Sequence, residues 1–218
     1  MISNRLKSLV KYVDKNDKII DIGCDHALLD IYLIKNKIID NIIVSDVHPS
    51  ALNAGIENIK KYKLENKIDT RLGDGLKALK EKDVVDTILI SGMGTNTIKT
   101  ILDKNKLGSI NKLIIQSNND HELLRKYIVE LGYMIEAEEY FVDHKKSYIN
   151  IIFKKGEKKY SNIELRYGPY LLHDYYYLKF ELDKCNKILN LIPNMKFRYR
   201  FKLKREIKLI NKLIDRLD

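Results

Sequence analysis

The sequence predicts an α/β protein, with a largely parallel sheet that ends in an antiparallel hairpin and a C-terminal pair of helices. Within residues 1–153, short β-branched runs alternate with longer amphipathic stretches, which is typical of a parallel sheet covered by helices on both faces. Two extended runs joined by a polar turn then close this region. After Gly156 the apolar residues recur at alternating spacings of three and four, the pattern of paired helices.

Five short apolar runs predict the parallel strands, at residues 18–22, 41–46, 68–72, 85–90 and 112–116. Helical patterns lie between and after them, at residues 27–36, 49–63, 75–81, 95–104 and 120–131. Asp120 and Gly132 bound the last of these helices as caps. Residues 134–141 and 147–154 predict a β-hairpin, because a polar turn at residues 143–146 joins two extended runs.

The C-terminal region predicts an antiparallel helical hairpin. Pro169 is expected at the first position of its first helix. A heptad seam follows, formed by Leu171, Tyr175, Leu178, Leu182, Cys185, Leu189 and Ile192. Pro193 ends it, and a second seam runs through Leu203, Ile207, Ile210, Ile214 and Leu217. The alternative is one long helix kinked at Pro193. We therefore expect two units, a sheet domain at residues 1–156 and a helical hairpin at residues 157–218.

Composition excludes several classes of protein. The chain has 218 residues, of which 44% are hydrophobic, so it is long and apolar enough to bury a core. No apolar stretch approaches the ~20 residues that span a bilayer, and the N-terminus lacks the apolar core of a signal peptide. Cys24 and Cys185 are the only cysteines, which argues against a disulfide framework. We expect a cytoplasmic protein without membrane association.

Charge is distributed unevenly along the chain. The net charge is +10, but residues 1–153 contribute +1 and residues 154–218 contribute +9. A basic module of this kind indicates a polyanionic partner such as nucleic acid. Its densest part, with Tyr199 and Phe201 interleaved, predicts phosphate contacts by Lys196, Arg198, Arg200, Lys202, Lys204, Arg205 and Lys208.

Acids and glycines follow the predicted strands, where an open parallel sheet binds its ligands. Gly23 allows a tight turn after the first strand, but Asp25 occupies the second glycine position of a dinucleotide fingerprint. A carboxylate there would repel a pyrophosphate, whereas it suits a cationic ligand such as S-adenosylmethionine. Asp46 ends the second strand, 25 residues after Asp21, where an acid can accept hydrogen bonds from both ribose hydroxyls.

Three further loops complete this edge. Asp74, between Gly73 and Gly75, can accept a hydrogen bond from an adenine amino group. The glycines in the segment 91–95 leave room for a ligand or a substrate base. In the segment 116–119, the carboxamides of Gln116 and Asn118 can satisfy the donor and acceptor edges of a base.

Taken together, the segments 21–29, 45–47, 71–76, 90–94 and 116–118 resemble the bacterial tRNA (adenine(22)-N1)-methyltransferase family, a group of class I S-adenosylmethionine-dependent enzymes. The resemblance spans about residues 1–155, and a basic helical appendage is the family's other feature. It implies a Rossmann-like fold and S-adenosylmethionine as cofactor, with no metal. Two residues depart from the family pattern: Thr95 replaces a usual glycine, and Ser117 replaces a usual proline.

The resemblance also implies roles for individual residues. Cofactor contacts are expected from Asp21, Gly23, Cys24, Asp25, His26, Asp46, Val47, Gly73, Asp74, Gly75, Ser91, Gly92 and Met93. Asn118 and Gln116 are expected to hold the acceptor adenine, and Asp25 lies near either the base or the cofactor's amino group. The expected partner is tRNA, bound by a monomer. The alternatives are methylation of another RNA position and a non-catalytic RNA-binding protein that keeps the fold.

Overall fold

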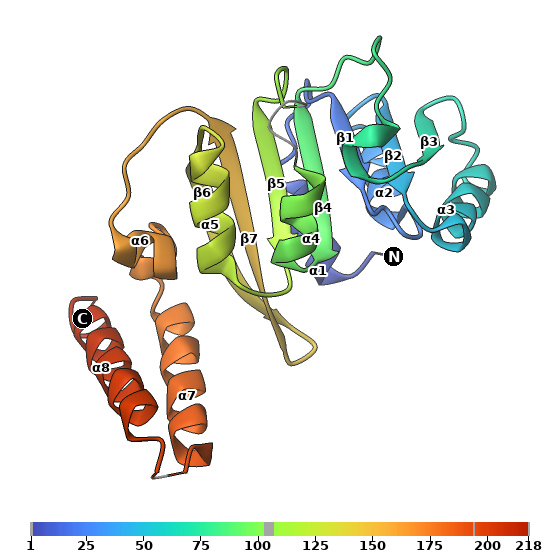
Figure 1. Ribbon diagram of the computed structural model, residues 1–218. Helices are drawn as coiled ribbons and strands as arrows, with labels where there is room; N and C mark the ends of the chain where they lie inside the picture. Colours follow the sequence, from blue (N-terminus) through green and yellow to red (C-terminus); the bar gives the residue numbers. More distant parts are fainter. Residues whose placement is uncertain (1, 103–106, 194, 218) are drawn as a thin grey trace.

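A seven-stranded mixed sheet forms the centre of the protein. The computed structural model describes residues 2–102, 107–193 and 195–217. The strands are β1 (Ile19–Ile22), β2 (Ile42–Asp46), β3 (Ile68–Leu72), β4 (Thr87–Met93), β5 (Lys112–Ser117), β6 (Tyr133–Asp143) and β7 (Lys146–Lys155). Their order is β3-β2-β1-β4-β5-β7-β6 (Figure 1). The first five are parallel, and β7 pairs antiparallel with both β5 and β6, so the predicted sheet is confirmed.

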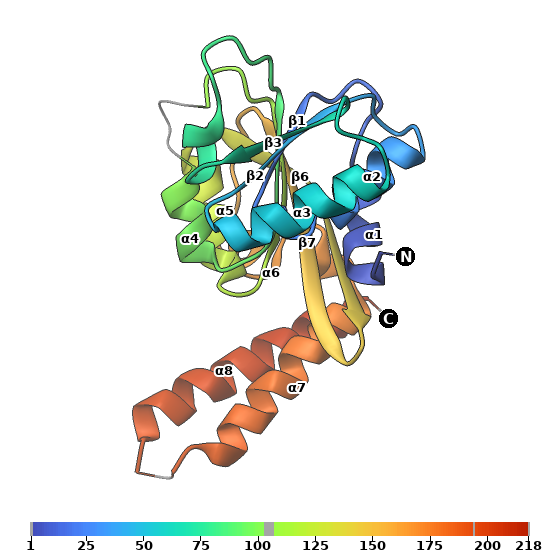
Figure 2. The ribbon, with the colours of Figure 1, turned by 90° about the vertical axis from the view of Figure 1, so that its right-hand side faces the viewer.

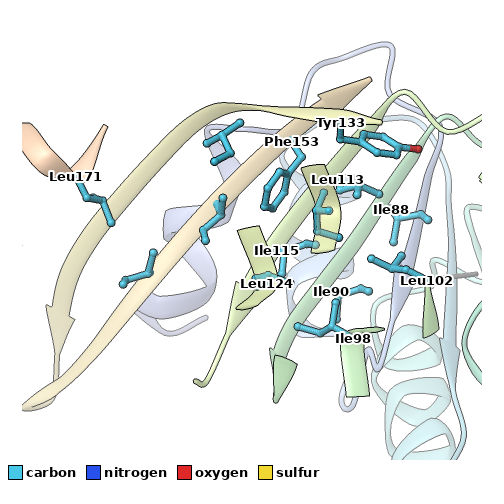
Figure 3. Packing of buried hydrophobic residues seen from close by; sticks show 14 of the residues in the cluster. Ile88, Ile90, Ile98, Leu102, Leu113, Ile115, Leu124, Tyr133, Phe153 and Leu171 are labelled. Carbon is cyan, nitrogen blue, oxygen red and sulfur yellow. The ribbon is translucent and has the colours of Figure 1, made fainter. Parts of the chain in front are cut away.

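Helices cover both faces of the sheet because successive strand residues point to opposite sides. One core cluster joins Ile19, Leu89 and Ile114 to helices α1 (Asn4–Val10), α2 (Leu28–Lys35) and α3 (Pro49–Lys61). The other joins the neighbouring Ile20, Ile88 and Leu113 to α4 (Thr95–Ile101) and α5 (His121–Glu130). Figure 3 shows the second cluster, in which side chains of α4 and α5 pack on β4, β5 and β7.

Two local expectations differ from the structure. Residues 75–78 form only a short 3₁₀ segment (η1, Gly75–Ala78), and the predicted residues 79–81 are not helical. The last residues of the predicted helix 95–104 lie outside the described residues. The prediction that Pro169 begins a helix is wrong: α6 (Asn162–Tyr167) ends at Gly168, and a 3₁₀ segment, η3 (Leu171–His173), follows. Helices α1 and α6 were not expected.

The C-terminal region extends from the sheet as a pair of adjacent helices, α7 (Tyr175–Leu191) and α8 (Phe197–Ile214) (Figure 2). They are separate helices rather than one kinked helix. Leu178, Leu182 and Cys185 of the predicted seam are buried, whereas Tyr175 is exposed because it begins α7.

The base of this helical hairpin shares the core of the sheet. Tyr167, Leu171 and Tyr177 are buried in the same cluster as the inner strands. Arg125 of α5 donates to Glu138 of β6 over 2.6 Å, with both side chains fully buried. The same guanidinium donates to the carbonyls of Leu165 and Arg166 in α6. Residues on both sides of position 157 therefore form one continuous packed interior.

Candidate cofactor and acceptor site

A cavity of about 840 Å³ opens at the carboxyl ends of the parallel strands. Strands β1, β2, β3 and β4 all run into it because they share one direction. All thirteen residues that the sequence predicts for cofactor binding lie in its lining: Asp21, Gly23, Cys24, Asp25, His26, Asp46, Val47, Gly73, Asp74, Gly75, Ser91, Gly92 and Met93. The strand ends that the sequence predicted to bind a ligand therefore meet in one cavity.

The loop after β1 has the left-handed backbone that its glycine predicted. Gly23 has φ of +79°, and Asp25 and Ala27 follow with φ of 49° and 54°. The amides of Gly23 and Cys24 both donate to the carbonyl of Ser45, over 2.8 and 3.1 Å. A side chain at position 23 would be strained, and its Cβ would lie 2.1 Å from the Met93 methyl group. This position therefore requires glycine for its conformation as well as for space.

Asp46 is held rigidly at the end of β2. It is 7% exposed, and its two carboxylate oxygens accept from the backbone amides of His48 and Asp25 over 2.8 and 3.3 Å. Each oxygen has two lone pairs, so each can accept a further hydrogen bond from a ligand hydroxyl. The geometry suits a ribose diol.

Behind the loop, Asp21 and Asp30 form a buried carboxyl pair. No described N–H or O–H group donates to either oxygen of Asp30, although the side chain is fully buried. Burial raises the pKa of Asp30 to about 7, and burial followed by the charge of Asp30 raises the pKa of Asp21 well above its usual range. Two coupled, buried carboxyls disfavour a second negative charge, which favours a proton held between them.

Helix α4 and the turn after β3 also line the cavity. Gly75 has φ of +60°, and its missing side chain leaves space for Ile101. Thr97, Thr100 and Ile101 also line the cavity. The sequence did not predict these three as cavity residues, because nothing in a short helical segment distinguishes a ligand-facing side from a solvent-facing side.

The two carboxamides expected to hold a base occupy different positions. Gln116 is 1% exposed and lies outside the cavity lining. Its Oε1 accepts from Arg5 Nη1 over 3.0 Å and its Nε2 donates to Asn150 Oδ1 over 2.6 Å, so both ends of the amide are engaged within the protein. Asn118 is exposed at the rim, where its Nδ2 donates to the carbonyl of Gly92 over 2.6 Å. Of the two, Asn118 is the exposed one, and it contacts Gly92 of the cavity lining.

Thr95 and Ser117, the two departures from the family pattern, contact each other. Both are buried, and their hydroxyl oxygens lie 2.9 Å apart. Thr95 also donates to the carbonyl of Asn119 over 2.6 Å, and its backbone amide donates to Asn119 Oδ1 over 2.9 Å. The pair ties the start of α4 to the loop after β5, directly behind the rim that carries Asn118.

Arg5 is a cavity residue that the sequence analysis missed. It lies on the short helix α1, and its guanidinium reaches across to Gln116 of β5 and to Gly92. A signal was present in the composition, because only 8 of the 40 basic residues are arginines. In a chain that uses lysine so heavily, an arginine marks a place where a planar set of donors is needed.

The seven basic residues predicted for RNA lie at or near the start of α8. Six are exposed: Lys196, Arg198, Lys202, Lys204, Arg205 and Lys208. Arg200 is half-buried instead, and it donates to the carbonyls of Leu189 and Ile192 at the end of α7 over 2.9 and 2.7 Å. Its position shows a structural role in closing the turn between the two helices.

The described residues contain neither a candidate metal site nor a candidate membrane-spanning helix. In residues 2–102, 107–193 and 195–217, no three His, Cys, Asp or Glu side chains are grouped so that they could hold a metal ion. Within the same ranges, none of the helices has the length and apolar character needed to cross a membrane.

Comparison with known proteins supports this interpretation of the cavity. Residues 2–152 match the family model described as a methyltransferase domain. The chain is 29% identical over 171 residues to the tRNA (adenine(22)-N(1))-methyltransferase of Bacillus subtilis, covering 77% of this chain and 71% of the relative.

Two solved structures extend the likeness over nearly the whole chain. A Streptococcus pneumoniae protein in complex with S-adenosyl-L-methionine is 29% identical, with a TM-score of 0.89 over 98% of this chain and 100% of that one. TrmK of M. capricolum, in complex with S-adenosyl-homocysteine, is 30% identical, with a TM-score of 0.87 over 100% of both chains. This chain belongs to the methyltransferase domain family and, within it, to the tRNA (adenine(22)-N1)-methyltransferases.

Proposed function

We propose that this protein transfers a methyl group from S-adenosylmethionine to N1 of adenine 22 in tRNA. The observation that carries the proposal is the cavity at the strand ends, which gathers a left-handed glycine loop, a ribose-binding acid and a buried carboxyl pair. These groups fit the cofactor's charges and hydroxyls. The exposed basic residues of α8 supply a second, separate surface for the phosphates of an RNA.

Each residue then has a defined task toward the cofactor. Asp46 accepts hydrogen bonds from the ribose, and Asp21, which lines the cavity, accepts one from the ammonium group. Asp74 accepts a hydrogen bond from the adenine amino group, with Gly73 and Gly75 leaving room for the ring. Gly92 and Met93 line the side from which the acceptor base approaches.

S-adenosylmethionine supplies an electrophilic methyl group on its sulfonium. The in-plane lone pair of adenine N1 attacks this carbon while the bond from the methyl carbon to sulfur breaks, and S-adenosylhomocysteine leaves. No proton has to leave N1, so the protein needs no general base there. Its task is positioning, which can supply ~7–11 kcal/mol of the barrier. Asn118 holds the adenine edge at the rim, and the exposed carboxylate of Asp25 stabilises the positive charge that develops on the methylated base.

Since the reacting N1 lies on the Watson–Crick edge, the acceptor adenine must be unpaired or turned out of its helix. The helical hairpin at residues 157–218 holds the tRNA while residues 1–156 hold the cofactor. Tertiary shape, read through phosphates and sugars, then selects the substrate. We further propose that the protein acts as a monomer in the cytoplasm.

The test is to map the modified nucleotide. Purified protein is incubated with unmodified tRNA and isotopically labelled S-adenosylmethionine, and the tRNA is digested and analysed by mass spectrometry. We expect 1-methyladenosine at position 22 and no labelled product from the same tRNA with guanine at that position. Labelling of another nucleotide would refute the site of modification, and the absence of label in any tRNA would refute the enzymatic activity.

A further inference from the structure

Large apolar side chains gather on the surface at the end of the helical hairpin that lies farthest from the sheet (Figure 2). Among the described residues, sixteen large hydrophobic side chains are exposed, and five of them lie between positions 191 and 201. Two of the five, Phe197 and Phe201, are 74% and 51% exposed although they belong to the first turns of α8. Clustered apolar side chains that the core does not use indicate a binding surface.

The two rings lie on the face of α8 that points away from α7. Leu203 and Ile210 make the contact with the core that α7 shares, and Phe201 is two residues, or about 200° around the helix, from Leu203. Phe197 and Phe201 share a face because they are four residues apart. Arg205 follows four residues later, with its Cζ 4.7 Å from the ring centroid of Phe201. Phe197, Phe201 and Arg205 therefore form an aromatic strip along the outer side of α8.

Cations surround the aromatic strip. Helix α8 contains seven Lys or Arg residues and one acid, Glu206, which is engaged by Arg166 of α6 over 2.7 Å. Lys204 and Lys208 are exposed and follow Phe197 and Phe201 by seven residues, so they lie on the same side of the helix as the rings.

This combination of rings and cations selects one kind of partner. A second copy of this chain would bring like charges together, which opposes self-association through the strip. A membrane-surface helix presents a continuous apolar face, but the continuous apolar face of α8 already packs against α7. RNA offers both phosphates for the cations and flat bases for the rings.

The helical hairpin extends to the side of the sheet from which an acceptor base enters. Strand β5 ends at Ser117, whereas β7 begins at Lys146 and pairs with β5 only from Asn150 onwards. The turn between β6 and β7 therefore projects beyond the carboxyl ends of the parallel strands. Figures 1 and 2 show the helical hairpin extending in the same general direction as this turn. An RNA bound at the cavity rim is thus on the side to which α8 extends.

We propose that the aromatic strip of α8 stacks on unpaired bases of the tRNA, beside the phosphates that the neighbouring lysines contact. The inference rests on the proposed function and names the part of the substrate that α8 binds. Only nucleotides outside the paired arms expose the faces of their bases, so the strip binds a loop and not a double helix. Arg205 holds the Phe201 ring by a cation–π contact and adds a planar face of its own.

The first test measures the affinity for two RNAs with and without the ring. Fluorescence anisotropy gives the dissociation constants of an end-labelled unmodified tRNA and of a fully paired RNA duplex with the same number of phosphates. The proteins are the parent chain, Phe201→Leu, Phe201→Tyr and the control Lys208→Gln, which removes an exposed cation from the same side of α8.

Phe201→Leu should weaken tRNA binding about 5- to 150-fold, the range for one lost base stack, and leave duplex binding unchanged. Phe201→Tyr keeps an aromatic face and should bind tRNA within about threefold of the parent. The slope of the logarithm of the tRNA association constant against the logarithm of the salt concentration should be unaltered in Phe201→Leu and smaller in magnitude by about 1 in Lys208→Gln. Unchanged tRNA affinity in Phe201→Leu, or an equal loss for the duplex, would overturn the inference.

The second test detects stacking directly. The chain has no tryptophan, so Phe201→Trp introduces a single one, and the control Tyr176→Trp places it at a 77% exposed position in the first turn of α7. We expect tRNA to quench the fluorescence of Phe201→Trp and inorganic polyphosphate to leave it unchanged. Equal quenching by polyphosphate, or equal quenching in Tyr176→Trp, would contradict stacking at the strip. A blue shift with phosphatidylglycerol vesicles and no response to tRNA would assign the strip to a membrane surface instead.

The outcomes separate this inference from the proposed function. If the parent chain methylates tRNA but Phe201→Leu and Phe201→Trp behave as their controls do, the inference alone fails. If the parent chain neither binds nor methylates any tRNA, the proposed function fails and the inference fails with it.

Discussion

The buried ion pair between Arg125 and Glu138 predicts a large stability effect from a single substitution. Replacing Arg125 with Met leaves Glu138 fully buried with only backbone donors, and it removes the hydrogen bonds to the carbonyls of Leu165 and Arg166. Removing one partner of such a pair typically costs ~3–5 kcal/mol. For a chain of this length that corresponds to a fall in melting temperature of roughly 6–20 °C.

A neighbouring pair supplies the control. Lys11 and Glu139 are also 2.6 Å apart, but their side chains are 54% and 27% exposed, so Lys11→Met should cost no more than about 1 kcal/mol. The double variant Arg125→Met with Glu138→Leu should recover most of the loss, because an apolar pair of similar volume replaces the charges.

The assay is urea unfolding followed by far-ultraviolet circular dichroism, with the slope against urea compared between variants. Without Arg125, the pKa of Glu138 rises further above its unfolded value, so the loss in stability should shrink as the pH falls. A loss for Arg125→Met no larger than that for Lys11→Met would refute the reasoning. A double variant as unstable as the single one would also refute it.

Three further predictions concern the site and the RNA surface. Burial raises the pKa of Asp30 to about 7, above its unfolded value near 4, so the folded state binds the proton more tightly. The free energy of unfolding should therefore fall as the pH rises between these two values. Asp30→Asn should flatten this pH dependence in unfolding experiments from pH 4 to 8. Asp46→Ala should weaken S-adenosylhomocysteine binding at least tenfold, as measured by calorimetry. Asp25→Asn should instead lower kcat and leave that binding within about threefold. Weaker binding by Asp25→Asn with unchanged binding by Asp46→Ala would contradict the assigned roles. Replacing Lys204, Arg205 and Lys208 with Gln should weaken tRNA binding and leave cofactor binding unchanged. The slope of the logarithm of the tRNA association constant against the logarithm of the salt concentration should fall in magnitude by about 2–3. An unaltered slope would exclude phosphate contacts at these positions.

The strands and the cofactor loops could be predicted because their signals are local. Each parallel strand is a continuous β-branched run, and each ends at a residue with a distinctive backbone or charge, such as Gly23 or Asp46. Parallel direction alone then places these ends at one edge of the sheet. For this reason the thirteen residues predicted for the cofactor all line the cavity, and most of the lining residues that were not predicted come from helices.

The residues that were missed or misplaced depend on tertiary contacts. Arg5 faces the cavity because α1 packs on β5 and β7, and no pattern in seven residues reveals that packing. Gln116 has the chemistry to hold a base, but that chemistry is used by Arg5 and Asn150. Pro169 has the signature of a helix start, yet Gly168 before it has φ of +93° and lies against the Arg125–Glu138 pair, where even a Cβ would be 2.3 Å from Glu138 Oε2.

The hydrogen bond between Thr95 and Ser117 couples the choice of residue at these two positions. Serine at 117 is acceptable with glycine at 95, since its hydroxyl can also donate to the carbonyls of Met93 and Asn119. Threonine at 95 with proline at 117 would place a ring carbon where a hydroxyl now lies 2.9 Å from Thr95 Oγ1, a separation too short for carbon and oxygen. The effect on stability of a substitution at 117 therefore depends on which residue occupies 95.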